Sequence, residues 1–266
     1  MRRPILMVMV VAAFGWMGGQ AAAVPIAVDL ELVLAADVSG SVDDTDFDLQ
    51  RTGYFAAFNN PALATAIQSG AIGSIAVTLI YWSDSAAVAV PWTLIDDASS
   101  ASAFAALVAA ALRPSSGGTG LVNAMNVAAG QFATNNYDGT RQVIDISGDG
   151  SESNACTFNV MNCVPLQNAR AAALAGGVDA INALWIDDRD FFGDDPTDII
   201  NALTYGTTNV IGGTGAFQDI VQDFPEFGAA MDRKIIREVA PVPEPGTLAL
   251  LGLGLAGLRA MSRRRH

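Results

Sequence analysis

Histidine is almost absent from this sequence, because its only histidine is the last of 266 residues, His266. We expect the C-terminal tail that carries it to be removed from the mature chain, because residues 241–266 have the pattern of a sorting element. A Ser-His-Asp triad is then excluded. The Gly-x-Ser-x-Gly segment that presents the nucleophile of α/β-hydrolases is also missing. The sequence therefore argues against catalysis, and a metal-dependent hydrolase is the less favoured alternative.

Basic residues are scarce as well. The chain has 14 Lys and Arg against 27 Asp and Glu, which gives a net charge of −13. Six of the basic residues lie in the two tails, so the body between them keeps eight basic and 26 acidic residues. Such a surface repels nucleic acid and anionic membranes. We therefore expect no nucleic-acid partner.

The sequence contains two cysteines, Cys156 and Cys163, with six residues between them. That spacing is not the Cys-x-x-Cys of redox proteins, and two cysteines without histidine make a poor zinc site. An even number of cysteines in an exported protein favours a disulfide. We expect Cys156 and Cys163 to form one and to close a small loop.

The N-terminus has the pattern of a secretory signal peptide. Arg2 and Arg3 precede a short apolar run at residues 5–13, and small residues end the segment at Ala21-Ala22-Ala23. The run is too short and too interrupted by glycine to favour a membrane anchor. We interpret residues 1–23 as a signal peptide that is cleaved before Val24.

The C-terminus carries a second sorting element in residues 241–266. Pro243-Glu244-Pro245 precedes an apolar stretch at 248–258, and an arginine cluster ends the chain. Eleven residues of helix rise only about 17 Å, against about 30 Å of hydrocarbon, so this short transmembrane helix suits transient anchoring. The order of elements resembles the PEP-CTERM sorting signal of Gram-negative bacteria. The resemblance implies an exosortase partner, cleavage near Pro-Glu-Pro, and delivery to the cell surface or extracellular matrix.

Between the tails, residues 24–240 form one α/β domain. Apolar runs typical of strands alternate with helical segments, and the last helix is expected over residues 216–239. The pattern predicts a doubly wound, mostly parallel six-stranded sheet with helices on both faces. The short link Ser83-Asp84-Ser85 predicts a hairpin and hence one antiparallel edge strand. The expected strands are 28–36, 74–82, 86–94, 141–147, 178–186 and 209–212.

Three predicted loops carry hard oxygen ligands. Asp37, Ser39 and Ser41 follow the first strand, Thr119 lies in a glycine-rich loop before a helix, and Asp149 follows the 141–147 strand. Ligands of such sheets bind at the carboxyl ends of the strands. Two carboxylates and three hydroxyls there suit Mg²⁺ or Mn²⁺. A plain turn rich in Asp, Ser and Gly is the alternative for the first loop taken alone.

In this order, the three elements resemble the metal-ion-dependent adhesion site (MIDAS) of von Willebrand factor A domains, over roughly residues 28–239. The resemblance implies that Ser39, Ser41 and often Thr119 bind the metal directly, while Asp37 and Asp149 act mainly through water. A partner's carboxylate commonly completes the site. One departure is Asp145 within the 141–147 strand, which leaves Asp145 as an alternative to Asp149. The Ser-Gly-Asp-Gly variant is similar to an uncharacterised bacterial secreted subfamily.

These observations favour an exported, non-catalytic adhesion module of the cell surface or biofilm matrix. Its expected partner is an acidic protein or exopolysaccharide that binds through the cation. A structural matrix protein without metal-dependent binding is the main alternative. A nucleotide-binding fold is disfavoured, because the glycine-rich loops at 117–120 and 212–215 do not follow the first strand or complete Gly-x-Gly-x-x-Gly.

Overall fold

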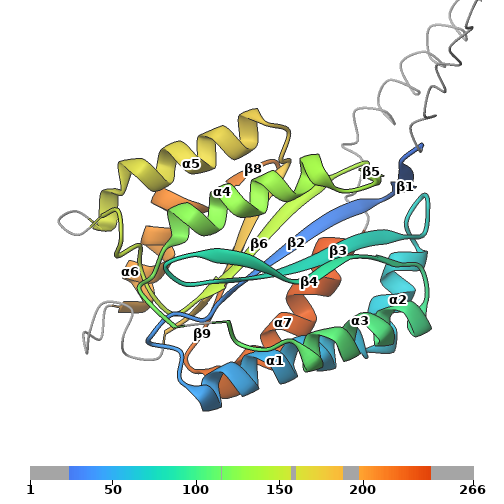
Figure 1. Cartoon of the computed structure of the whole chain (residues 1–266), viewed down its shortest axis with the longest axis horizontal. Helices are drawn as coiled ribbons and strands as arrows, with labels where there is room; N and C mark the ends of the chain where they lie inside the picture. Colours follow the sequence, from blue (N-terminus) through green and yellow to red (C-terminus); the bar gives the residue numbers. More distant parts are fainter. Residues whose placement is uncertain (1–23, 115, 157–159, 188–197, 241–266) are drawn as a thin grey trace, which may run out of the picture.

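A computed structural model describes residues 24–114, 116–156, 160–187 and 198–240. Its main sheet has the strand order β4-β3-β2-β6-β7-β8, and β9 also pairs with β7. The strands β2, β3, β6, β7 and β9 run parallel to one another, whereas β4 is antiparallel to β3 and the short β8 is antiparallel to β7. This confirms the expected mostly parallel sheet with an antiparallel edge strand (Figure 1), but the sheet has seven strands instead of the expected six, because β9 also joins it. The strands span Leu30–Asp37 (β2), Ile75–Trp82 (β3), Ala86–Ile95 (β4), Gln142–Gly148 (β6), Ala180–Ile186 (β7), Gly212–Gly213 (β8) and Gln218–Val221 (β9).

Helices cover both faces of the sheet (Figure 1). One face packs against α1 (Asp44–Phe58), α2 (Pro61–Gln68), α3 (Ala98–Ala110) and α7 (Phe224–Val239). The other packs against α4 (Leu121–Gln131), α5 (Val164–Ala175) and α6 (Asp198–Tyr205). Short turns of helix complete the fold at Phe132–Thr134 (η1), Val160–Asn162 (η2) and Gly206–Val210 (η3).

The central strand β2 explains why the first apolar run is nearly continuous. All eight of its residues are buried, and successive side chains enter opposite cores. Leu32 and Leu34 join the core below α1 and α7, whereas Val33 and Ala35 join the core below α4 and α5. A parallel strand covered on both faces has no solvent side, so it lacks the polar alternation of an exposed strand.

Glu31, the one charged residue in that run, is buried but satisfied. Its carboxylate accepts hydrogen bonds from Asn135 Nδ2 at 2.5 Å and from the backbone N–H of Gly139 at 2.8 Å. These contacts fasten β2 to a small two-stranded sheet of β1 (Ile26–Val28) and β5 (Tyr137–Gly139). The expected strand over 28–36 is therefore divided at Asp29 between two sheets.

The C-terminal third differs from the sequence prediction. Residues 206–210 form the π-helical turn η3, and only Gly212 of the expected strand at 209–212 enters the sheet. Residues 218–221, expected in the last helix, form β9 and fill the free edge of β7. The helix α7 begins later, where the Asp223 side chain accepts a hydrogen bond from Glu226 N at 3.3 Å and Pro225 lies in the first turn.

The expected disulfide between Cys156 and Cys163 is present, with their Cα atoms 5.6 Å apart. Cys163 is fully buried, and its backbone N–H donates to Asn209 Oδ1 at 2.8 Å. The bridge therefore joins the segment after β6 to the start of α5, and the hydrogen bond to Asn209 joins the same point to η3.

Replacing both Cys156 and Cys163 with alanine should lower the free energy of unfolding by about 2–3 kcal/mol. The physical reason is the loss of a closed loop from the unfolded chain. Urea denaturation of the exported protein measures the difference, with the unmodified protein under oxidising conditions as the reference. Detection of two alkylated thiols in the exported, unmodified protein would contradict the pairing.

Among the helices that the structure describes, none is long and apolar enough to cross a membrane. The predicted signal peptide (1–23) and the predicted sorting segment with its short helix (241–266) lie outside the described residues, including Pro243, Glu244 and Pro245.

Candidate metal centre

The carboxyl ends of β2 and β6 meet at one edge of the sheet. The two strands are parallel neighbours in which Ala36 pairs with Ser147, so Asp37 and Asp149 leave the sheet side by side. The loop before α4 closes over them, because Gly40 N donates to Gly117 O at 2.8 Å. A ligand-binding site at the carboxyl ends of neighbouring parallel strands is the position expected for this kind of sheet.

Hydrogen bonds join four of the five predicted site residues. Asp37 Oδ1 accepts from the backbone N–H of Ser39 at 2.7 Å, and the hydroxyls of Ser39 and Ser41 lie 3.2 Å apart. Ser41 Oγ donates to Asp149 Oδ1 at 2.8 Å. Two hydroxyls and two carboxylates from separate loops therefore converge on one point.

Thr119 lies against the same cluster. A methyl group built on Gly150, the neighbour of Asp149, would lie 3.5 Å from Thr119 Oγ1. Two hydrogen bonds of 2.9 Å, from Thr119 N to Ser153 Oγ and from Ser153 N to Thr119 O, fix the threonine to the loop after β6. All five predicted residues are thus brought together from three loops.

The electrostatics of this cluster are unfavourable without a cation. Asp37 and Asp149 are both fully buried, and Asp37 Oδ2 has no hydrogen-bond partner within the described residues. Burial, followed by repulsion from Asp149, raises the pKa of Asp37 well above its usual range. One carboxylate oxygen of Asp37 is therefore buried without a hydrogen-bond donor. Together with the second carboxylate and the three hydroxyls, it forms a set of oxygen ligands that fits a hard divalent ion.

Close packing beside Asp37 requires the glycine that precedes Asp149. A methyl group on Gly148 would lie only 2.9 Å from Asp37 Oδ2 and 3.0 Å from the Trp82 ring. A larger residue would push the carboxylate away from its neighbours, so the glycine that precedes Asp149 has a steric explanation.

Arg113 holds the first loop in place, a role that the sequence analysis missed. Its Nη2 donates to three backbone carbonyls, those of Val38 at 3.1 Å, Ser39 at 2.9 Å and Val42 at 2.5 Å. Gln50 Nε2 adds a hydrogen bond of 3.2 Å to Asp37 O. Arg113 is more than 70 residues away in the sequence from the loop that it holds. The only local signal for it is its position after α3 and just before Pro114.

Glu152 orders the other two loops and was also missed. Its Oε2 accepts from Val122 N at 2.7 Å in the first turn of α4, where the capping position is Gly120 and offers no side chain. Its Oε1 accepts from the backbone of Asn154 and Ala155 at 2.8 and 2.9 Å. One buried carboxylate therefore caps α4 and fixes the loop that follows Asp149.

Asp145, the alternative to Asp149, is engaged elsewhere. It lies in the middle of β6, fully buried, and forms an ion pair with Lys234 of α7. Lys234 also pairs with Glu238 at 2.7 Å. Burial, together with the charge of Asp145, raises the pKa of Glu238 to about 7. These three side chains form a buried charged cluster under the sheet, so the geometry favours Asp149 as the carboxylate of the candidate metal centre.

Comparison with known proteins identifies the family. A family profile described as "Protein of unknown function (DUF1194)" matches residues 27–243. The chain belongs to the DUF1194 family. A second profile, the PEP-CTERM protein-sorting motif, matches residues 241–265 of this DUF1194 chain, which confirms the C-terminal sorting signal. A search of the curated proteins finds no match.

Several solved structures share the fold. Proximal thread matrix protein 1 (PTMP1) from the mussel byssus is 12% identical, with a TM-score of 0.54, over 82% of the DUF1194 chain and 48% of its own. PTMP1 has also been solved with a zinc-occupied MIDAS motif, with a TM-score of 0.53, 12% identity, and coverage of 82% and 47%. A von Willebrand factor type A protein from Catenulispora acidiphila gives 0.53 at 15% identity, over 80% and 43%.

The DUF1194 chain spans about half the length of these structures or less. At these identities the likeness establishes the von Willebrand factor A type of fold, as the sequence predicted.

Proposed function

We propose that the DUF1194 chain is an exported, non-catalytic binding module that holds Mg²⁺ or Mn²⁺ and binds an acidic partner through that ion. The metal ligands are Asp37, Ser39, Ser41, Thr119 and Asp149. The observation that carries the proposal is the buried Asp37 Oδ2, which lacks a hydrogen-bond donor among the described residues and lies in a cluster with a second carboxylate. A divalent cation supplies the positive charge that this pair of carboxylates needs.

The ligand set also favours binding of an acidic group. Three of the five ligands are neutral hydroxyls, so the ion keeps much of its positive charge and attracts an anion. Ser41 is exposed and Thr119 half-buried, so the cluster is accessible from solvent. The partner is the Asp or Glu side chain of a surface protein or a uronic acid of an exopolysaccharide. The zinc-occupied MIDAS of PTMP1, a matrix protein of the same fold, supports this reading by analogy.

We place the module at the cell surface or in the extracellular matrix of a Gram-negative bacterium. The PEP-CTERM profile supports export and a passing encounter with an exosortase. Because the body between the two tails has 26 acidic and only eight basic residues, it repels an acidic partner at long range, while the metal attracts it at contact. Modest salt screens the repulsion first, so binding should strengthen as salt is raised modestly.

The expected result is that the purified protein binds the producing cells' matrix in Mg²⁺ and releases it in EDTA. Thr119→Ala should weaken binding in Mg²⁺ several-fold, because it removes one hydroxyl ligand from the ion. Thr65→Ala is the matched control, since Thr65 is an exposed residue of α2 whose hydroxyl bonds only to Pro61 O. Sedimentation of matrix with bound protein measures the effect across a salt series. Undiminished binding in EDTA and in Thr119→Ala would leave only a structural matrix role.

A further inference from the structure

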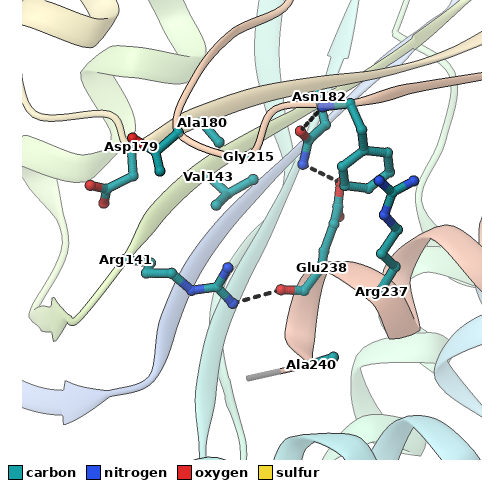
Figure 2. Close-up of a pocket in the computed structure, with 11 residues that line it drawn as sticks. Arg141, Val143, Asp179, Ala180, Asn182, Gly215, Arg237, Glu238 and Ala240 are labelled. Atoms are coloured by element: carbon teal, nitrogen blue, oxygen red, sulfur yellow. Dashed lines mark hydrogen bonds between the residues drawn. The ribbon is translucent and has the colours of Figure 1, made fainter. Parts of the chain in front are cut away.

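A cavity lies at the amino ends of the strands β6 and β7. It has a volume of about 590 Å³, within the range of small-molecule sites. Arg141 and Asp179, which directly precede β6 and β7, line one side, and the end of α7 lines the other with Arg237, Glu238 and Ala240 (Figure 2). The metal centre is at the carboxyl ends of the same strands, so the two sites are separated by the length of the sheet.

Two guanidinium groups at this cavity, those of Arg141 and Arg237, have no carboxylate within ion-pair distance among the residues that the structure describes. Arg141 Nη2 donates to the backbone carbonyl of Glu238 at 2.7 Å, and the guanidinium carbon of Arg237 lies 3.6 Å from the centre of the Phe217 ring. Within the described part of the chain, neither arginine forms an ion pair, whereas Arg51 and Arg113 do. Acidic side chains act on Arg141 only at longer range, so both guanidinium groups keep N–H donors for a ligand.

The back of the cavity offers one more polar group. Glu238 is 3% exposed, and its Oε1 accepts from Asn182 Nδ2 at 2.9 Å and from Lys234 Nζ at 2.7 Å. Its Oε2 is buried without a hydrogen-bond partner among the residues described. Because burial and Asp145 raise the pKa of Glu238 to about 7, a neutral carboxyl with an O–H to donate is available near neutral pH. Glu238 can therefore tolerate an anion beside it.

The remaining residues that line the cavity are suited to contact with an apolar part of a ligand. Val143 and Ala180 contribute small aliphatic side chains from β6 and β7, and the Asp179 carboxylate is already bonded to the backbone N–H of Gln142 at 2.8 Å. Burial lowers the pKa of Arg141, which is the sign of a partly desolvated cation, while Glu238, Asp179 and Asp29 oppose that shift. A partly desolvated guanidinium binds carboxylates strongly, because two parallel N–H groups match the two oxygens.

We propose that this cavity binds a small organic anion, namely a carboxylate carried on an apolar body. The guanidinium groups of Arg141 and Arg237 hold the carboxylate, and the body packs against Val143 and Ala180. The site is distinct from the metal centre and does not depend on it.

The test uses the purified full chain in EDTA, with 3-phenylpropionate as the probe and its neutral amide, 3-phenylpropionamide, as the matched ligand control. Ligand-observed NMR titration should give saturable binding of the acid and at least ten-fold weaker binding of the amide. Arg237→Gln should weaken binding of the acid by about ten-fold, because it removes a charged hydrogen-bond donor. Arg233→Gln should leave binding unchanged, since Arg233 is an exposed arginine of the same helix and its loss changes the net charge equally.

Arg141→Lys is the second variant, because it keeps the positive charge but removes the two-pronged geometry. It should weaken binding of the acid several-fold. If Arg237→Gln melts at a lower temperature than the unmodified chain, the affinity of Arg141→Lys is the deciding measurement in its place. Absence of saturable binding, equal binding of acid and amide, or unchanged affinity in the deciding arginine variant would each overturn the proposal. Because the measurements are made in EDTA, the outcome is independent of metal binding at Asp37 and Asp149.

Discussion

Replacing Lys234 with methionine should destabilise the protein by about 3–5 kcal/mol, the usual cost of removing one member of a buried ion pair. Lys234 is the only lysine of the chain and is fully buried under the sheet. Among the described residues, it is the one cation that forms ion pairs with Asp145 and Glu238. Methionine fills the same space, so the expected loss comes from two carboxyl groups left in the core without a positive partner.

Urea denaturation at pH 8 measures this loss. Arg233→Met is the control, because Arg233 precedes Lys234 on α7 but is exposed, and its replacement should change stability by less than about 0.5 kcal/mol. Adding Asp145→Asn and Glu238→Gln to Lys234→Met should restore part of the loss, since no buried charge then remains. A loss below about 1 kcal/mol for Lys234→Met would contradict the buried pairing.

The same cluster predicts the direction of the pH dependence. The pKa of Glu238 is raised from 4.5 to about 7 in the folded protein. Its contribution to stability is therefore fully present below about pH 4.5 and is lost as the pH rises to about 7. In Lys234→Met the Glu238 carboxyl can take up a proton at pH 5, so the destabilisation measured there should be smaller than at pH 8.

Asp37→Asn should reduce the affinity for Mn²⁺ by at least a hundred-fold, the second large effect that we expect. Asparagine keeps the hydrogen bond that Asp37 Oδ1 accepts from Ser39 N, so the loop geometry is preserved while a negative charge is lost. Saturating metal at a hundred times its dissociation constant should stabilise the unmodified protein by about 2.7 kcal/mol. The variant should show little of this stabilisation.

Calorimetric titration and thermal melting with Mn²⁺ together test this expectation. Without metal, Asp37→Asn should be at least as stable as the unmodified protein, because it relieves the repulsion between two buried carboxylates. Asp138→Asn is the control for charge, since Asp138 is an exposed residue of β5, away from the carboxyl ends of β2 and β6. Equal heats of Mn²⁺ binding for Asp37→Asn and Asp138→Asn would remove Asp37 from the metal centre.

The parallel sheet could be predicted because each of its long strands has a recognisable pattern within its own sequence. The buried runs at β2, β3, β6 and β7 have the length and composition of strands, and the expected sheet is confirmed by the fold. In the main sheet β9 was missed, since residues 218–221 pair with a distant strand and have no pattern of their own that separates them from the following helix. The small sheet of β1 and β5 was not expected either. Pro225 and Asp223 were the available signals for the true start of α7.

The five residues of the candidate metal centre could be found because each follows a strand or precedes a helix in the order that the resemblance requires. The structure brings them together, and their binding of metal stays a prediction. The supports could not be found in the same way. Arg113 and Glu152 act through backbone groups that are distant in the sequence, and Lys234 pairs across a core. Such contacts depend on the assembled fold and leave no spacing in the sequence.

The two ends of the domain lie on the side away from the metal centre. The described chain enters through β1, which pairs with β5 beside the start of β6, and leaves at Ala240 on the rim of the cavity lined by Arg141 and Arg237. The β6 strand, seven residues long, places about 23 Å between that rim and Asp149, at 3.3 Å per residue. A chain attached through its C-terminal end would therefore present Asp37 and Asp149 on the side of the domain farthest from the point of attachment. The length of the sheet would separate that point from the proposed binding surface.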